Sequence, residues 1–158
     1  MSRRIFILAV DGAMASSLVG NRDLFMVANM IAKNTAKSAA PLFDVHFVSM
    51  DGRSVECVNG CRMDVDGSID DIRAGDTLFS PAFMIPNPAS VGDNLLQWQE
   101  LIEWLREHGA GLDLIATNCS GSYALAEAGL LDGGRVTTAW WLQSEMQRRY
   151  PAIQVDRD

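Results

Sequence analysis

Residues 112–128 read LDLIATNCSGSYALAEA, and this stretch decides the fold class. Leu112–Thr117 is a short apolar run, which is typical of a strand buried in a parallel sheet. Ser122–Ala128 is rich in alanine and leucine, which are strong helix formers. Only Asn118–Gly121 separates the two segments, so the chain must turn sharply from strand to helix. A strand followed at once by a helix is the repeating unit of an α/β fold.

The same alternation of short apolar runs and amphipathic stretches continues through the rest of the chain. Ile5–Val10 is almost wholly apolar, as a central parallel strand should be. A helix is expected over Asp23–Ala32, with Asn21 or Asp23 as its N-cap. The apolar stripe of this helix comprises Leu24, Val27, Ala28 and Ile31.

The remaining expected elements complete a mostly parallel sheet with helices between its strands. The strands are Phe43–Val48, Thr77–Ser80, Val136–Thr138 and Ala152–Val155. A long helix ends at His108–Gly109, and a further helix covers Trp140–Tyr150. The buried residues expected in the long helix are Leu95, Trp98, Leu101, Ile102 and Leu105.

The Asn59–Gly60 pair between Cys57 and Cys61 predicts an inserted β-hairpin with a two-residue turn. That register pairs Cys57 with Arg62, which would place the two sulfur atoms on opposite faces of the ribbon. We therefore expect no disulfide, and an odd total of three cysteines fits a reducing compartment.

No metal and no other cofactor is expected. The C-x3-C spacing of the hairpin lacks a second cysteine or histidine pair. The acidic run between Asp64 and Asp71 lacks the glycine and terminal glutamate of a calcium-binding loop, which favours a solvated turn.

The composition is that of one globular domain. The 158 residues are 48% hydrophobic and 21% charged, and no apolar run is long enough to cross a bilayer. A net charge of -7 repels phosphate backbones, so we expect neither nucleic acid nor a membrane as a direct partner. The first residues imitate a signal peptide, but Asp11 interrupts their short apolar run, which favours the cytoplasm.

Cys119 lies at the strand-to-helix turn, where a side chain projects from the carboxyl edge of the sheet. The amides of the following helix favour a thiolate there, and Gly121 allows the backbone to turn sharply. A cysteine after an apolar strand is more often a small buried residue. Position alone therefore leaves both interpretations open.

The segment from Asn118 to Trp140, NCSGSYALAEAGLLDGGRVTTAW, closely resembles the elbow of the ThiJ/PfpI superfamily. It carries C-x-G, L-A-x-A-G-L-L-D-G and T-T-x-W in the order and spacing of that family. It is most similar to the amino-terminal sensory domains of AraC-type transcriptional regulators. The resemblance implies a flavodoxin-like three-layer sandwich, a homodimer, and a single domain over residues 1–158. It leaves open whether the last elements of the family are complete.

The resemblance also implies where the site lies. Cys119 matches the elbow cysteine, and Gly121 matches the glycine that follows it. Ala139 stands where many relatives have histidine, and Ser17 is the best match to the glutamate of the enzymatic and redox-sensing branches. The residues expected to line a ligand pocket are Ser17, Ala82, Asn118, Cys119, Ser120, Gly121, Ala139 and Trp140.

The absence of the family's histidine and glutamate at positions 139 and 17 favours a sensor over an enzyme. A cysteine hydrolase needs a base, normally histidine, and the chain has only His46 and His108. The sequence positions of these two histidines give no indication that either forms a catalytic dyad with Cys119. We expect a non-catalytic domain that binds a small-molecule effector and acts on DNA through a C-terminal domain beyond Asp158. The alternatives are a cysteine enzyme, such as an amidase, peptidase or glyoxalase-like protein, and an oxidation sensor at Cys119.

Overall fold

The computed structural model describes residues 2–36 and 40–156, which form two compact units. The first unit runs to Pro81 and also takes in Leu112–Ala116. The second comprises Ala82–Gly111 and the chain from Thr117 onward. Most of the main sheet belongs to the first unit, and the elbow belongs to the second.

The main sheet has five strands in the order β5-β2-β1-β6-β7. The β1–β2, β1–β6 and β2–β5 pairings are parallel, as the alternating pattern predicts. β1 is central because its apolar run is buried on both faces, with Ile5–Leu8 at most 1% exposed. The strands are β1 (Arg3–Leu8), β2 (Phe43–Ser49), β5 (Gly67–Ser68), β6 (Thr77–Ser80) and β7 (Leu114–Thr117).

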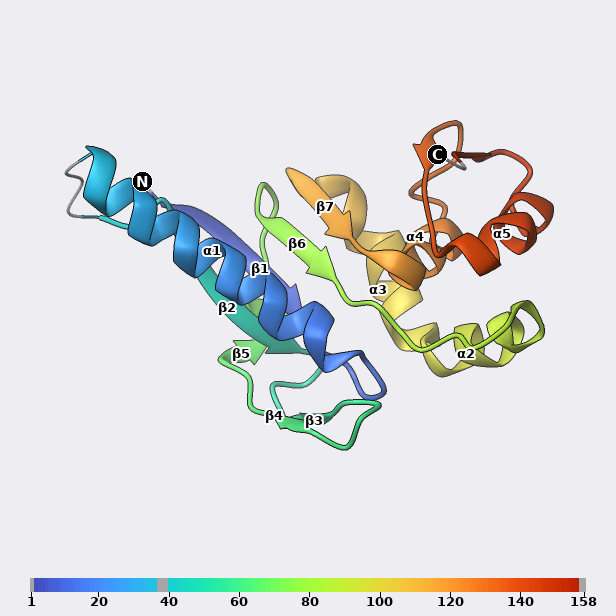
Figure 1. The fold of residues 1–158 in the computed structure, drawn as a ribbon, viewed down its shortest axis with the longest axis horizontal. Coiled ribbons are helices and arrows are strands. Elements are labelled where there is room, and N and C mark those ends of the chain that lie inside the picture. Colours follow the sequence, from blue (N-terminus) through green and yellow to red (C-terminus); the bar gives the residue numbers. More distant parts are fainter. Residues whose placement is uncertain (1, 37–39, 157–158) are drawn as a thin grey trace. The chain divides into compact units, whose positions relative to one another are not determined.

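Helix α1 (Ala15–Ala36) lies along β1 and β2 and covers one face of the sheet (Figure 1). Its Phe25 ring meets Phe43 and Phe79 edge-on, at centroid distances of 5.0 and 5.4 Å. The expected start at Asp23 is wrong, because the helix begins at Ala15. Asn21 does not cap the helix: its Nδ2 donates to the Ser17 carbonyl at 2.7 Å, inside the helix.

The apolar stripe predicted for this helix faces away from the sheet. Leu24 is 62% exposed, Val27 41% and Ile31 54%. The sheet side is taken instead by Leu18 and Phe25, together with Asn29, whose side-chain amide exchanges two hydrogen bonds with the backbone of Phe43. The helix is apolar on two sides, so periodicity alone could not identify the buried one.

The hairpin is present, but its predicted register is wrong. β3 (Val55–Glu56) pairs antiparallel with β4 (Arg62–Met63), and Glu56 lies opposite Arg62. The turn has three residues rather than two, because Gly60 adopts a φ of 80° and the Gly60 amide donates to the Cys57 carbonyl. Cys57 therefore lies opposite Cys61.

The second unit contains most of the remaining helices. The single long helix expected before His108 is divided at Trp98, whose φ of -100° and ψ of 16° are not helical. Trp98 stacks on Phe83 at a centroid distance of 3.7 Å, and the predicted core residues of both helices are buried. The elements are α2 (Val91–Gln97), α3 (Gln99–His108), α4 (Ser122–Glu127), α5 (Gln143–Arg149), and the paired strands β8 (Arg135–Val136) and β9 (Gln154–Val155).

Short 3-10 helices replace parts of the expected elements. Trp140–Leu142 is such a turn, so the helix expected over Trp140–Tyr150 begins only at Gln143. The strands expected at Val136–Thr138 and Ala152–Val155 are shorter than predicted. The other 3-10 turns cover Ile69–Asp71, Pro88–Ser90, Gly109–Gly111 and Cys119–Gly121.

Adjacent leucines of α2 offer a matched test of its buried face. Leu95 is 5% exposed and Leu96 is 72% exposed. We expect Leu95→Ala to lower the free energy of unfolding by about 2–5 kcal/mol, because it leaves a cavity in the core. Leu96→Ala should change it by about 0.5 kcal/mol or less. Urea unfolding followed by circular dichroism measures both, and equal losses would contradict this placement of α2.

Candidate functional site

Cys119 occupies a strained turn between strand and helix. β7 ends at Thr117, a 3-10 turn covers Cys119–Gly121, and α4 begins at Ser122. Among the described residues other than glycine, Cys119 alone has a positive φ, of 52°. A residue with a Cβ atom in this region costs roughly 1–2 kcal/mol, so neighbouring contacts must hold it there. The side chain of Cys119 is exposed and can be reached from solvent.

Ser120 fastens the turn to the segment that follows β6. Its hydroxyl donates to the Phe83 carbonyl at 2.6 Å and accepts from the Phe83 amide at 3.0 Å. Ser120 is 1% exposed, so these bonds form away from water. They satisfy both backbone polar groups of Phe83 and bring Ala82 close to the elbow.

A third segment reaches the elbow through the carbonyl of Cys119. That oxygen accepts from the hydroxyl of Ser122 at 3.1 Å and from the hydroxyl of Thr138 at 3.2 Å. Ala139 follows Thr138 directly, so this hydrogen bond brings the T-T-x-W motif to the elbow. The acceptor is a backbone atom, so these bonds orient the turn and leave the thiol free to project.

Seven of the eight predicted pocket residues belong to the second unit: Ala82, Asn118, Cys119, Ser120, Gly121, Ala139 and Trp140. Ser120 and Gly121 are buried and serve the turn, while Asn118 and Cys119 are exposed. Ser17 belongs to the first unit, where its hydroxyl donates to the Met14 carbonyl at 2.7 Å in the first turn of α1.

Two aromatic rings follow Ala139, and they differ in how firmly they are held. Trp140 is 79% exposed, and its ring meets that of Trp141 edge-on at 5.6 Å. Trp141 is anchored, since its Nε1 donates to the Ile85 carbonyl at 3.0 Å. Trp140 therefore presents a large apolar surface to solvent.

Three residues that contribute to the elbow are not among the predicted site residues: Ser122, Thr138 and Phe83. Thr138 lies inside the T-T-x-W motif and could have been found there, because a hydroxyl next to a site is a frequent hydrogen-bond donor. Phe83 contributes its backbone to the elbow, and a backbone contact leaves no side-chain pattern that a sequence can reveal.

Both histidines have other partners. The Nδ1 atom of His108 lies 3.0 Å from the Trp104 carbonyl, and its ring stacks on that indole. His46 lies 3.1 Å from a carboxylate oxygen of Asp44 and stacks on Phe6. Ala139 has no group that accepts a proton. None of these contacts of the two imidazoles involves Cys119, and a cysteine hydrolase needs a base at its thiol.

Among residues 2–36 and 40–156, no group of three or more His, Cys, Asp or Glu side chains lies close enough to hold a metal ion. None of the helices in that part of the chain is long and apolar enough to span a membrane.

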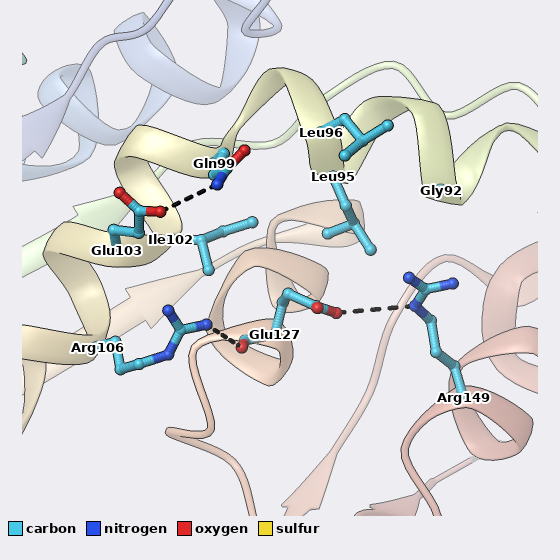
Figure 2. Close-up of a pocket in the computed structure, with 9 residues that line it drawn as sticks. All are labelled: Gly92, Leu95, Leu96, Gln99, Ile102, Glu103, Arg106, Glu127 and Arg149. Atoms are coloured by element: carbon cyan, nitrogen blue, oxygen red, sulfur yellow. Dashed lines mark hydrogen bonds and ion pairs between the residues drawn. The ribbon is translucent and has the colours of Figure 1, made fainter.

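A groove of about 260 Å³ lies between α2, α3, α4 and α5 (Figure 2). Figure 2 shows Arg106 and Arg149 reaching Glu127 from opposite sides. Arg106 donates to the Glu127 carbonyl at 3.0 Å, and the Arg149 Nε atom lies 3.7 Å from its carboxylate. The hydroxyl of Tyr150 donates to the same carboxylate at 2.5 Å. Burial raises the pKa of Tyr150, and the neighbouring Glu127 raises it further, so this donor stays protonated.

The charged groups of this groove are largely satisfied by one another. Glu127 is the last residue of α4, the helix that begins at the elbow. Its bonds to Arg106, Arg149 and Tyr150 therefore fix α4 against α3 and the region of α5. We interpret the groove as support for the elbow helix, and the exposed Cys119 surface as the better candidate site.

Because the Ser120 hydroxyl forms two hydrogen bonds with the Phe83 backbone, its removal should lower the stability of the fold measurably. We expect Ser120→Ala to lower the free energy of unfolding by about 1–3 kcal/mol, because it leaves the Phe83 amide and carbonyl buried without their partner. Ser144→Ala, at an exposed position of α5, is the control and should change it by about 0.5 kcal/mol or less. Urea unfolding compares the two, and a neutral Ser120→Ala would show that the turn is held by other contacts.

Comparisons with known proteins agree with this geometry. Residues 7–156 match the DJ-1/PfpI family. The chain is 34% identical over 158 residues to the HTH-type transcriptional regulator CdhR of Pseudomonas aeruginosa, covering 100% of this chain and 43% of that protein. It is 27% identical over 146 residues to GbdR, another HTH-type transcriptional regulator of that species, covering 92% of this chain and 36% of GbdR. The chain thus spans less than half the length of these relatives.

A solved structure has the same fold. The crystal structure of an AraC family transcriptional regulator from Pseudomonas putida aligns with a TM-score of 0.71 at 20% identity, covering 100% of this chain and 77% of that one. This likeness confirms the flavodoxin-like α/β class expected from the sequence. With the family match over residues 7–156, it confirms the resemblance read from the elbow motif: the chain belongs to the DJ-1/PfpI family.

Proposed function

We propose that the chain is the effector-sensing domain of an AraC-type transcriptional regulator, that it is not catalytic, and that its effector binds beside Cys119. The observation that carries this proposal is an exposed cysteine held in a strained turn by the hydrogen bonds of Ser120 and Thr138. Strain of this kind persists where the surrounding structure enforces it, and it is frequent at ligand sites. The names of the relatives CdhR and GbdR support a regulator.

The groups around the elbow suit a small molecule with one polar and one apolar side. Asn118 is exposed and offers both a donor and an acceptor. Trp140 offers an exposed ring, and large apolar rings bind ligands at low entropic cost because they have few rotatable bonds. We propose that Ala82 and Ala139, whose side chains are small, form the part of the pocket that lets a ligand approach the backbone, and that buried Gly121 shapes the turn behind it.

Binding to DNA would belong to a separate C-terminal domain. The net charge of -7 makes this chain a poor ligand for a phosphate backbone. The relatives named as HTH-type regulators are more than twice as long as the segment they share with this chain. A regulator that binds DNA would work in the cytoplasm, which we propose as the compartment.

Alkylation of Cys119 tests effector binding. Trypsin releases Cys119 in the peptide Glu107–Arg135, which contains no other cysteine. We expect at least one compound in a panel of single amino acids, amines and carboxylic acids to slow the reaction of Cys119 with iodoacetamide by about tenfold or more at saturation, because it occludes the thiol. Mass spectrometry of the peptide measures the rate, and exposed Cys61 in the same sample is the control.

Matched variants locate the site. Trp140→Ala should remove the protection of Cys119, whereas Trp104→Ala, on α3, should leave it unchanged. No protection across the panel would count against the sensor. If a compound in the panel is consumed and Cys119→Ser stops its turnover, the enzyme interpretation replaces the proposal.

We also propose that the domain forms a homodimer through the outward face of α1. Six large apolar side chains on this helix are 41–62% exposed: Val19, Leu24, Met26, Val27, Met30 and Ile31. Together they leave on the order of several hundred Å² of apolar surface on one face, the size at which such patches mark interfaces. A standard interface buries about 800 Å² per partner, and we propose this apolar face as the centre of such an interface.

The charges on α1 suit a second copy of the same helix. Arg22 faces its own sheet, where it meets Asp66 and Phe47, so Asp23 and Lys33 are the remaining charges. If two copies pack antiparallel about a two-fold axis at the level of Ala28, Asp23 of each copy lies opposite Lys33 of the other. An isologous interface requires self-complementarity of this kind.

A charge reversal tests the dimer. We expect sedimentation equilibrium to give a dimer for the unaltered chain and a monomer for Val27→Glu, because a buried unpaired carboxylate is costly at the centre of an interface. Asp23→Lys should weaken association by about tenfold, and the double variant with Lys33→Asp should restore it. Leu96→Glu, on α2, is the control. A monomeric unaltered chain, or a double variant that fails to recover, would contradict the proposed face.

A further inference from the structure

The β3–β4 hairpin brings two cysteines to directly opposite positions. The register Val55–Met63 and Glu56–Arg62 continues to Cys57 and Cys61, and the Cys57 amide donates to the Cys61 carbonyl at 2.8 Å. Opposite residues of an antiparallel ribbon project to the same face. Their Cα atoms are about 4.5–5.5 Å apart in such ribbons, and a disulfide needs about 4.4–6.8 Å.

We propose that Cys57 and Cys61 form a reversible dithiol–disulfide site, oxidised by hydrogen peroxide. The exposed Cys61 thiol gives up its proton while its sulfur attacks one oxygen of the peroxide. The O–O bond breaks, the sulfur becomes a sulfenic acid, and the departing hydroxide takes up the proton and leaves as water. The Cys57 sulfur then displaces that oxygen, forms the S–S bond and gives up its proton, so a second water leaves. Two thiols lose two electrons and two protons, and one peroxide becomes two waters. A low-molecular-weight thiol reverses the step.

The surroundings assign the two sulfur atoms different roles. Cys57 is 3% exposed, whereas Cys61 is exposed, so an oxidant reaches Cys61 first. Burial raises the pKa of the Cys57 thiol, and the neighbouring Cys61 and Asp11 raise it further. Cys57 therefore stays protonated until Cys61 has reacted, which suits a resolving thiol.

Oxidation would stiffen a ribbon that is hydrogen-bonded to the loop before α1. The Gly12 amide donates to the Glu56 carbonyl at 2.9 Å, and the Val58 amide donates to the Ala13 carbonyl at 3.0 Å. The Glu56 amide also donates to the side chain of Asp11 at 2.8 Å. The site thus acts on the start of α1 within the first unit. It goes beyond the proposed effector site, whose elbow contacts lie in the second.

Peptide mapping of the peroxide-treated chain tests the site. Trypsin releases both cysteines in the peptide Ser54–Arg62. After treatment of the folded chain, we expect this peptide to be lighter by two hydrogen atoms and to take up no alkyl group, and dithiothreitol should restore uptake of two. Cys57→Ser and Cys61→Ser should each abolish the loss of hydrogen, and Cys119→Ser should leave it unchanged.

The fold should favour the bond, which separates this site from chance pairing of two nearby thiols. In glutathione buffers, we expect the disulfide of the folded chain to be at least tenfold more stable than that of the urea-unfolded chain, because the ribbon holds the thiols in register. A peptide that gains oxygen without losing hydrogen would overturn the proposal. A disulfide favoured equally or more in urea would overturn it as well. Neither result affects protection of Cys119 by an effector.

Discussion

The buried hydroxyl of Ser120, bonded to both backbone polar groups of Phe83, is the constraint on which the candidate site depends. It ties the segment after β6 to the turn after β7, and the Thr138 hydroxyl ties a third segment to the same turn. Cys119 keeps its positive φ because these bonds fix the residues on either side of the unfavourable backbone conformation. The thiol at this turn is exposed.

The geometry of this elbow is therefore independent of catalysis. None of the bonds that maintain it involves the thiol, and none would be lost if the cysteine never reacted. A hydrolase needs a base in addition, and the ring of His108 is directed to the Trp104 carbonyl. A chain can thus keep the turn as the rim of a ligand site without a proton-transfer group beside the cysteine. This separation makes a sensory role compatible with a motif best known from enzymes.

The strands could be predicted from sequence because an apolar run bounded by turn residues has few alternatives: β6 covers Thr77–Ser80 as expected. Predictions failed where two local solutions differ little in energy. Asn59–Gly60 fits a two-residue turn, but a left-handed Gly60 also closes a three-residue turn, and only packing of the ribbon decides between them. The break at Trp98 coincides with its stack against Phe83, a contact that helical periodicity does not reveal. The elbow cysteine was predictable from its motif, whereas the Phe83 backbone was not.

The apolar stripe predicted for α1 lies on the exposed side of the helix, and there is a physical reason for this. A helix that covers a sheet on one side and meets water on the other shows one apolar stripe and one charged face. In its 22 residues α1 has only Arg22, Asp23 and Lys33 as charges, and both of its sides are apolar. This pattern, with few charges and two apolar sides, is typical of a helix that is buried on two sides. The periodicity thus selected a real apolar face, but the sheet occupies the other one, at Leu18 and Phe25. Without a partner, the exposed face of α1 leaves its leucine, isoleucine, valine and methionine side chains in water, which is unfavourable. This cost favours a second protein surface against the face.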